Sequence, residues 1–182
     1  MDRLAHLRLL AEYNGWMNRK LVAAARRLAP AELALDRGAF FGSILGTLNH
    51  LVVGDTIWLK RFAAHPAGFA SLDPVRALPA PGALNARVFD SLEPLAAHRA
   101  LLDDAILAWT GELVDADLDH PLRYANTRGV TSTRSFYALA VHFFNHQTHH
   151  RGQATALLNQ AGVDVGVTDL LALIPDLEPT ER

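Results

Sequence analysis

The chain has 182 residues, of which 50% are hydrophobic and 20% are charged, and its formal net charge is -2 at pH 7. This balance is typical of a globular protein and excludes an intrinsically disordered one, and the length fits one domain over residues 1–182. Without a basic excess, the sequence does not favour nucleic-acid binding. The absence of cysteine excludes disulfides, thiolate metal sites and cysteine nucleophiles.

The N-terminal segment carries charges throughout and lacks the apolar core of a signal peptide. Elsewhere, no uncharged apolar run approaches the roughly 20 residues that a membrane span needs. We therefore expect a cytoplasmic protein that does not associate with membranes.

Two helices are predicted in the first third of the chain. Apolar residues at spacings of three and four indicate a helix over residues 2–28, with Asn14 in its apolar seam and Pro30 after its end. Ser43 suits the N-cap of a second helix that continues to about Ala63. The first helix is thus long enough to cross a small domain.

The middle of the chain alternates between irregular and helical patterns. Residues 65–82 contain four prolines and predict a connection with little regular structure. A third helix is expected over residues 84–109, where Pro94 either kinks the helix or marks its true start. Residues 120–133 are strand-like and predict a short hairpin or an irregular loop.

A fourth helix is predicted over residues 135–160, capped by Ser132 or Thr133 and closed by Gly162. The apolar segment LLALIP that follows is expected to pack back onto the helices. The predicted fold class is therefore all-α. Its architecture is a four-helix bundle with a longer connection between the second and third helices, and bundles of this kind commonly build metal sites from facing helices.

Histidines are concentrated in the fourth predicted helix. Segment 142–153, HFFNHQTHHRGQ, contains His142, His146, His149 and His150. Residues four apart share one helix face, so His146 can offer an imidazole to one ion together with either His142 or His150. A polar helix face without any ion is the alternative explanation of the same spacing.

A mononuclear site needs a third protein ligand, and His50 in the second helix is the best candidate. Gly46 and Gly54 lie four residues on either side of His50 and would leave room for an ion beside its ring. The sequence contains neither the His-Glu-x-x-His motif of metalloproteases nor the Glu-x-x-His motif of di-iron bundles. An imidazole-dominated site suits zinc, nickel, copper or iron(II).

Three segments carry a resemblance to a known family: YNGWMNRKL at 13–21, SILGTLNHLVVGDTIWLKR at 43–61 and HFFNHQTHHRGQ at 142–153. With the hairpin-like YANTRGV, they resemble the DinB/YfiT-like family of metal-dependent bacterial proteins. The resemblance implies a four-helix bundle with a divalent transition metal, zinc or nickel foremost and iron as an alternative. The ligands it implies are His50, His146 and His150, with water in the open positions.

The resemblance also bears on neighbouring residues. His142 and His149 are then interpreted as residues beside the site or on the surface, and Arg151 as a structural or rim charge. Asn14 is interpreted as a buried structural amide, and Trp16 and Trp58 as core residues.

Three uses of the metal are consistent with the resemblance. Relatives in the wider superfamily imply a transferase that uses a low-molecular-weight thiol, with the thiol and a small-molecule substrate as partners. A metal-dependent hydrolase is the second alternative, although no general base for it is evident. A non-catalytic metal-binding or stress-response protein is the third, and a fourth protein ligand such as His149 or Asp55 would favour it. We also expect self-association as a homodimer, through an interface that the sequence does not identify.

Overall fold

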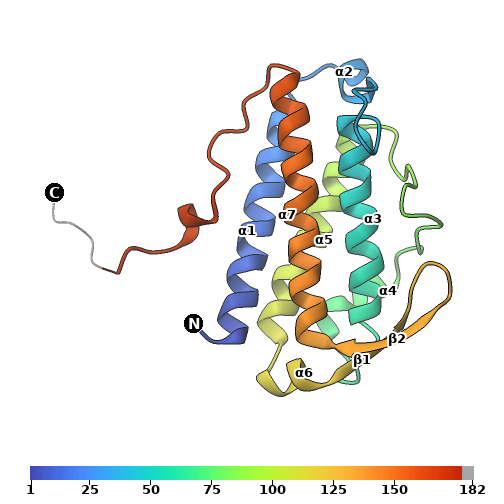
Figure 1. Cartoon of the computed structure of the whole chain (residues 1–182), viewed down its shortest axis with the longest axis vertical. Helices are drawn as coiled ribbons and strands as arrows, with labels where there is room; N and C mark the ends of the chain where they lie inside the picture. The colour runs from blue at the N-terminus through green and yellow to red at the C-terminus, as the bar shows by residue number, and fades with distance from the viewer. Residues whose placement is uncertain (178–182) are drawn as a thin grey trace.

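The structure is a computed structural model that describes residues 1–177, and it is mainly helical. Four long helices lie side by side: α1 (Arg3–Ala25), α3 (Ile44–Phe62), α5 (Leu92–Glu112) and α7 (Phe136–Gln160) (Figure 1). Shorter helical segments connect them or follow α7: α2 (Pro30–Ala34), η1 (Ala70–Leu72), α4 (Asp73–Arg76), α6 (Asp115–Asp119) and η2 (Leu170–Leu173). Strands β1 (Pro121–Ala125) and β2 (Thr131–Ser135) form a two-stranded antiparallel sheet.

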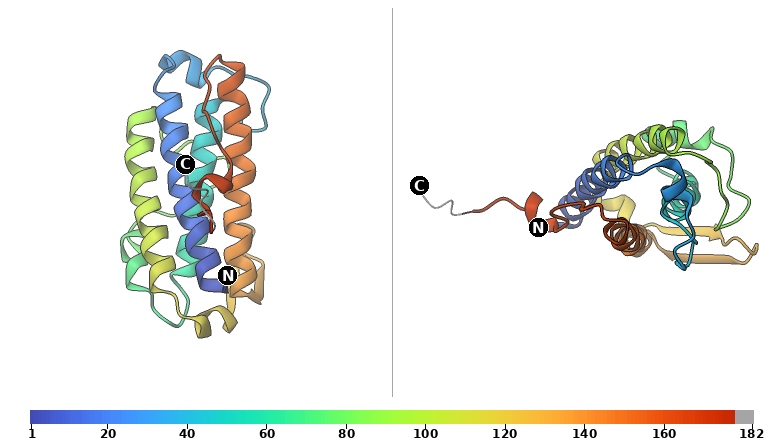
Figure 2. Two further views of the ribbon diagram at one scale, coloured as in Figure 1. Left: turned by 90° about the vertical axis from the view of Figure 1, so that its left-hand side faces the viewer. Right: turned by 90° about the horizontal axis from the view of Figure 1, so that it is seen from above.

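The long helices pack in a ring. Helix α1 contacts α5 and α7, and α3 contacts the same two helices (Figure 2). At the hairpin end, the core is aromatic, and Phe62 stacks on Trp109 with ring centroids 4.9 Å apart. Phe136 and Phe143 pack edge-on against Phe62, so α3, α5 and α7 share one buried layer. Direct contact between α3 and α7 brings together the two helices that carry the predicted metal ligands.

The hairpin predicted as one alternative before α7 is present as a two-stranded sheet, so the fold is mainly helical rather than all-α. Asn126 and Gly129 form its turn, and Gly129 takes a φ of 78° that favours glycine. Because strand pairing continues to Ser135, Ser132 and Thr133 lie in β2 and cannot cap α7. Ser135 caps the helix instead, accepting a hydrogen bond from the Ala138 amide.

Some helix ends agree with the sequence prediction and others differ from it. The Ser43 cap is confirmed, since its side chain accepts a hydrogen bond from the Gly46 amide at 3.0 Å. The third long helix starts at Leu92 rather than at residue 84, which places Pro94 in its first turn, where a missing amide costs nothing. The first helix ends at Ala25, three residues earlier than expected. Part of the proline-rich connection is helical, since it contains η1 and α4.

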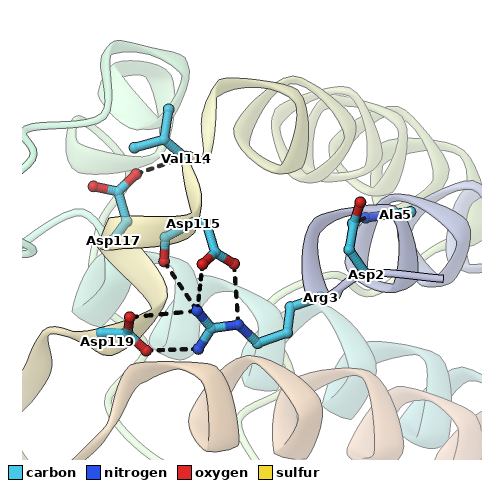
Figure 3. A network of polar contacts seen from close by, with 7 residues as sticks. All are labelled: Asp2, Arg3, Ala5, Val114, Asp115, Asp117 and Asp119. Carbon is cyan, nitrogen blue, oxygen red and sulfur yellow. Dashed lines mark hydrogen bonds and ion pairs between the residues drawn. The ribbon is translucent and has the colours of Figure 1, made fainter.

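A polar contact fixes the start of α1. Asp2 caps the helix by accepting a hydrogen bond from the Ala5 amide at 2.7 Å. The Arg3 guanidinium lies between the carboxylates of Asp115 and Asp119, each at 2.6 Å, as Figure 3 shows. These contacts tie α1 to α6, the segment that leads into the hairpin.

The segment after α7 runs along α1, and its backbone carbonyls accept hydrogen bonds from side chains of that helix. The Tyr13 hydroxyl donates to the Thr168 carbonyl at 2.7 Å, and the Lys20 ammonium donates to the Val167 carbonyl. The predicted packing of LLALIP is only partial, because Leu171 and Ile174 remain exposed. Within the described residues, we find no helix with the length and apolar character to cross a membrane.

Candidate metal centre

The three predicted ligands converge between α3 and α7. His50 lies near the start of α3, while His146 and His150 lie one turn apart on α7. The Nε2 atom of His50 is 3.1 Å from Nε2 of His146 and 3.1 Å from Nε2 of His150. Their nearest ligand atoms all lie within 4.8 Å of one another, so one ion could contact all three rings. We call these residues the histidine cluster.

Hydrogen bonds at the far side of two rings orient them toward the cluster. Nδ1 of His50 donates to the Leu84 carbonyl at 2.8 Å, and Nδ1 of His150 donates to Oε1 of Gln153 at 2.8 Å. A neutral imidazole with a proton on Nδ1 carries a lone pair on Nε2. The lone pairs of His50 and His150 therefore face each other at 3.1 Å, an unfavourable contact unless a cation lies between them.

Burial keeps the cluster neutral. Loss of hydration lowers the pKa of His50 and of His150 below the ordinary histidine value. The pKa of His146 falls to about 3, first because of burial and then because of its histidine neighbours. Neutral imidazole is the form that binds metals, so the cluster is in the metal-binding state at neutral pH.

The geometry fits a first-row divalent ion. Metal–nitrogen bonds of about 2.0–2.1 Å place neighbouring nitrogens about 2.8 to 3.0 Å apart for octahedral angles and about 3.3 to 3.4 Å apart for tetrahedral angles. The two 3.1 Å separations from His50 lie between these two ranges. His50 is buried, whereas His146 and His150 are partly exposed, so one side of the cluster faces outward. In residues 1–177, no carboxylate joins the group.

Phe41, which the sequence analysis did not identify, packs against two of the ligands. Its ring stacks on His50 with centroids 3.9 Å apart and meets His150 edge-on at 5.4 Å. It lies in the loop before α3, where apolar residues carry no periodic pattern that could have revealed it. The stacked ring restricts rotation of the His50 imidazole.

Asn49 is a second residue that the sequence analysis missed. Its side-chain amide donates to the Phe89 carbonyl, and its oxygen accepts the amides of Val88 and Phe89 at 2.9 Å each. These bonds pin the connection before α5 onto α3. The same connection supplies the Leu84 carbonyl that holds His50.

The two glycines beside His50 serve different neighbours. A Cβ on Gly54 would lie 2.8 Å from Cε1 of His146, so the absent side chain makes room for that ring. A Cβ on Gly46 would instead lie 2.0 Å from the Phe41 carbonyl oxygen. The prediction that both glycines leave room for an ion was therefore wrong for Gly46, because the backbone of Phe41 occupies the space beside it.

The other candidate histidines lie outside the cluster. His142 is exposed, with its ring 6.3 Å from that of His146 and 5.1 Å from that of Trp58. His149 is exposed and shares a hydrogen bond with the Gln153 amide at 3.2 Å. The interpretation of both as neighbouring or surface residues agrees with this placement. Trp58 and Trp16 are only partly buried, so their assignment to the core was too simple.

Asp55, considered above as a fourth ligand, belongs to a separate buried group. Its carboxylate accepts hydrogen bonds from Arg99 of α5 and from Gln147 of α7. Arg99 also pairs with Asp103 at 3.1 Å, and Arg151 lies close enough to both carboxylates to act on them electrostatically. We call Asp55, Arg99, Asp103 and Arg151 the ion-pair network.

Helix α1 joins this network through amides. Asn14 donates to Asp103 at 3.1 Å and accepts from Arg151, while Asn18 donates to Asp103 at 2.8 Å. All four long helices thus contribute a polar side chain to the interior. Asn14 is a buried structural amide, as predicted, and Arg151 is a buried structural charge rather than a rim charge.

Fold and cluster together define a mainly helical protein with three imidazoles that could hold one metal ion. The model of the DinB family matches residues 1–180, and the chain belongs to that family. It is similar to Protein DinB of Bacillus subtilis (strain 168), with 26% identity over 165 residues, which cover 88% of each chain. No solved structure matches the chain significantly.

Proposed function

We propose that the chain is a four-helix bundle that binds one divalent transition metal through Nε2 of His50, His146 and His150. Zinc and nickel are the first candidates and iron(II) is the next, because all accept imidazole ligands. The supporting observation is that Nε2 of His50 lies 3.1 Å from Nε2 of each of the other two, while Nδ1 of His50 and of His150 is already held by an acceptor. Such second hydrogen bonds are typical of histidines that bind metals.

The proposal includes an open coordination position for a small molecule. His146 and His150 are partly exposed, and both alternative fourth ligands are engaged elsewhere, Asp55 with Arg99 and His149 with Gln153. A non-catalytic site closed by four protein ligands is therefore less well supported. A divalent ion bound here would supply positive charge that lowers the pKa of a coordinated thiol or water.

For the chemistry, we propose a transferase that uses a low-molecular-weight thiol. Hydrolysis needs a nearby general base, and none of the described carboxylates lies within the histidine cluster. A thiol brings its own nucleophile and needs only to be bound and oriented. Because the chain contains no cysteine, that thiol must come from a small molecule.

Elemental analysis tests the metal proposal. The protein should be prepared without a metal-affinity tag and compared with a His50→Ala, His146→Ala double variant. His120→Ala is the control, because it removes an exposed imidazole whose ring contacts His65 at the hairpin end rather than the cluster. We expect about one equivalent of metal in the parent and the control, and loss in the double variant. Absence of metal from the parent after incubation with zinc, nickel and iron would refute the site.

Cobalt substitution tests the thiol. A thiolate that enters the coordination sphere of cobalt(II) produces an intense near-ultraviolet charge-transfer absorption, and the protein itself has no thiolate to interfere. Appearance of this band on addition of a small thiol would support the proposal. If the spectrum does not change at saturating thiol, the thiol-dependent transferase proposal is wrong, while the proposal of a metal site is unaffected.

A further inference from the structure

A pocket lies between α3, α7 and the hairpin, separate from the histidine cluster. Its volume is about 560 Å³, within the range of small-molecule sites. Its walls include the side chains of Trp58, Tyr124, Arg134, Ser135, Leu139 and His142. None of the residues that line it is acidic.

The pocket begins about one helical turn from the cluster. His142 lies four residues before His146, and Trp58 lies eight residues after His50, which correspond to about 6 Å and 12 Å of helix axis. The His142 ring is 6.3 Å from the ring of His146. A molecule of modest length in this pocket would reach the partly exposed side of the cluster.

The rings of Trp58 and Tyr124 and the guanidinium of Arg134 line the pocket, and Arg61 lies behind the two rings. The guanidinium of Arg61 lies 4.5 Å from the centroid of Trp58 and 4.9 Å from that of Tyr124. Tyr124 and Trp58 are themselves in contact, with centroids 5.4 Å apart. Among the ion pairs of the described residues, none involves Arg61 or Arg134.

The hairpin register places Arg134 on the pocket side. Arg134 pairs with Leu122 and therefore shares a face with Tyr124, because side chains alternate along a strand. Arg123 pairs with Thr133 on the opposite face and does not line the pocket. The two arginines of the strands, Arg123 and Arg134, thus lie on opposite faces of the hairpin.

We propose that this pocket binds a small molecule with a planar apolar body and a carboxylate, and presents its other end to the histidine cluster. The aromatic walls suit the apolar body, and Arg134 suits the carboxylate because no acidic residue lines the pocket to compete for this cation. The presentation of the ligand to the histidine cluster rests on the proposed function, because the ligand would then be the substrate or the thiol of the metal centre.

Binding of 3-phenylpropionate and of its neutral amide tests the charge requirement. We expect the carboxylate to bind roughly tenfold more tightly than the amide, as measured by the change in tryptophan fluorescence or by calorimetry. Arg134→Gln should abolish this preference, and the matched variant Arg123→Gln should retain it. Equal affinities for the two probes, equal losses in the two variants, or no binding at about 10 mM would overturn the proposal.

A paramagnetic ion tests the connection to the cluster. In cobalt-loaded protein, bound 3-phenylpropionate should show strongly enhanced proton relaxation, because the pocket begins within about 6 Å of helix axis from a ligand. The His50→Ala, His146→Ala variant should bind the probe but lose the enhancement. If the probe binds to fully cobalt-loaded parent protein without enhanced relaxation, the pocket does not present its ligand to the metal centre. If cobalt does not bind at all, the result counts against the metal site alone.

Discussion

The histidine cluster and the ion-pair network lie inside the same four helices but are built in opposite ways. In the network, the carboxylates of Asp55 and Asp103 meet the guanidinium groups of Arg99 and Arg151, so positive and negative charges balance. In the cluster, three like groups face one another, and no carboxylate of residues 1–177 accompanies them. The network is complete without any further ion, whereas the cluster gains a favourable arrangement only when a cation binds.

Adjacent positions on α7 serve the two regions. His146 faces the cluster and Gln147 faces the network, because successive helical residues are rotated by about 100°. We therefore expect changes in the network to affect stability and changes around the cluster to affect metal affinity. Four predictions examine this separation, from the largest effect to the smallest.

The first prediction concerns Arg99. Replacement by alanine leaves Asp55 and Asp103 buried without their principal counter-charge, which should lower the free energy of unfolding by about 3 to 5 kcal/mol. Urea denaturation of metal-free protein measures the change. Arg26→Ala, which breaks the exposed pair with Glu93 between α1 and α5, is the control and should leave the unfolding curve unchanged. Equal effects of the two variants would contradict a structural role for the network.

The second prediction concerns pH. Burial raises the pKa of Asp55 to about 6 despite the opposing effect of Arg99, whereas an unfolded chain has an aspartate pKa of about 4. The folded state then holds this proton more tightly, so the contribution of Asp55 to stability is largest below about pH 4 and falls as the pH rises toward 6. The total change is roughly 3 kcal/mol.

Comparison of parent and Asp55→Asn isolates this contribution, because all other groups titrate in both proteins. The parent should lose stability relative to the variant between about pH 4 and pH 6 in urea denaturation of the metal-free forms. A relative gain over the same interval would mean that attraction to Arg99 outweighs burial, and the direction of the pKa shift would be reversed.

The sequence revealed these two regions to very different degrees. Spacing on one helix indicated that His146 could share an ion with His142 or His150, and the place of His50 between two glycines of the second helix made it the best third ligand; the choice of His150 over His142 came with the family resemblance. Asn14 was noticed as a polar residue in an apolar seam, and Asp55 only as a possible fourth metal ligand. Their partners could not be inferred, because Arg99 and Arg151 lie on other helices and have no local pattern that marks burial.

Local signals also explain which parts of the fold were predicted. Ser43 and the apolar periodicity fixed the start of α3, since a cap and its helix are neighbours in sequence. The cap of α7 was misplaced because pairing with β1 kept Ser132 and Thr133 in a strand. The Leu84 carbonyl was unpredictable for a similar reason, since backbone atoms carry no sequence signature and the connection that contains Leu84 is held to α3 by bonds from Asn49 to Val88 and Phe89.

The third prediction concerns Gln153, which accepts the Nδ1 proton of His150. Replacement by alanine should reduce zinc affinity by about 10- to 100-fold, because a ligand loses the acceptor that fixes its orientation and tautomer. Competition with a chromophoric chelator measures the affinity. Gln160→Ala, at the exposed end of α7, should bind zinc like the parent. If Gln153→Ala also retained parental affinity, the acceptor would have no part in the site.

The last prediction separates packing beside the cluster from helix stability. A Cβ at Gly54 would lie 2.8 Å from Cε1 of His146, so Gly54→Ala must displace the imidazole. We expect a loss of about fivefold in zinc affinity, equivalent to about 1 kcal/mol. The control is Gly152→Ala on α7, where nothing lies within 4 Å of the added carbon.

Alanine is favoured over glycine within a helix by about 0.5 to 1 kcal/mol, so Gly152→Ala should stabilise the metal-free protein and leave zinc affinity unchanged. Gly54→Ala receives the same backbone benefit and therefore should not be much less stable than the parent without metal. A variant that keeps its stability but binds zinc more weakly would show that Gly54 makes room for a ligand. Parallel loss of stability and affinity would instead place Gly54 in the packing of α3 against α7, and the separation of the two regions would fail at this residue.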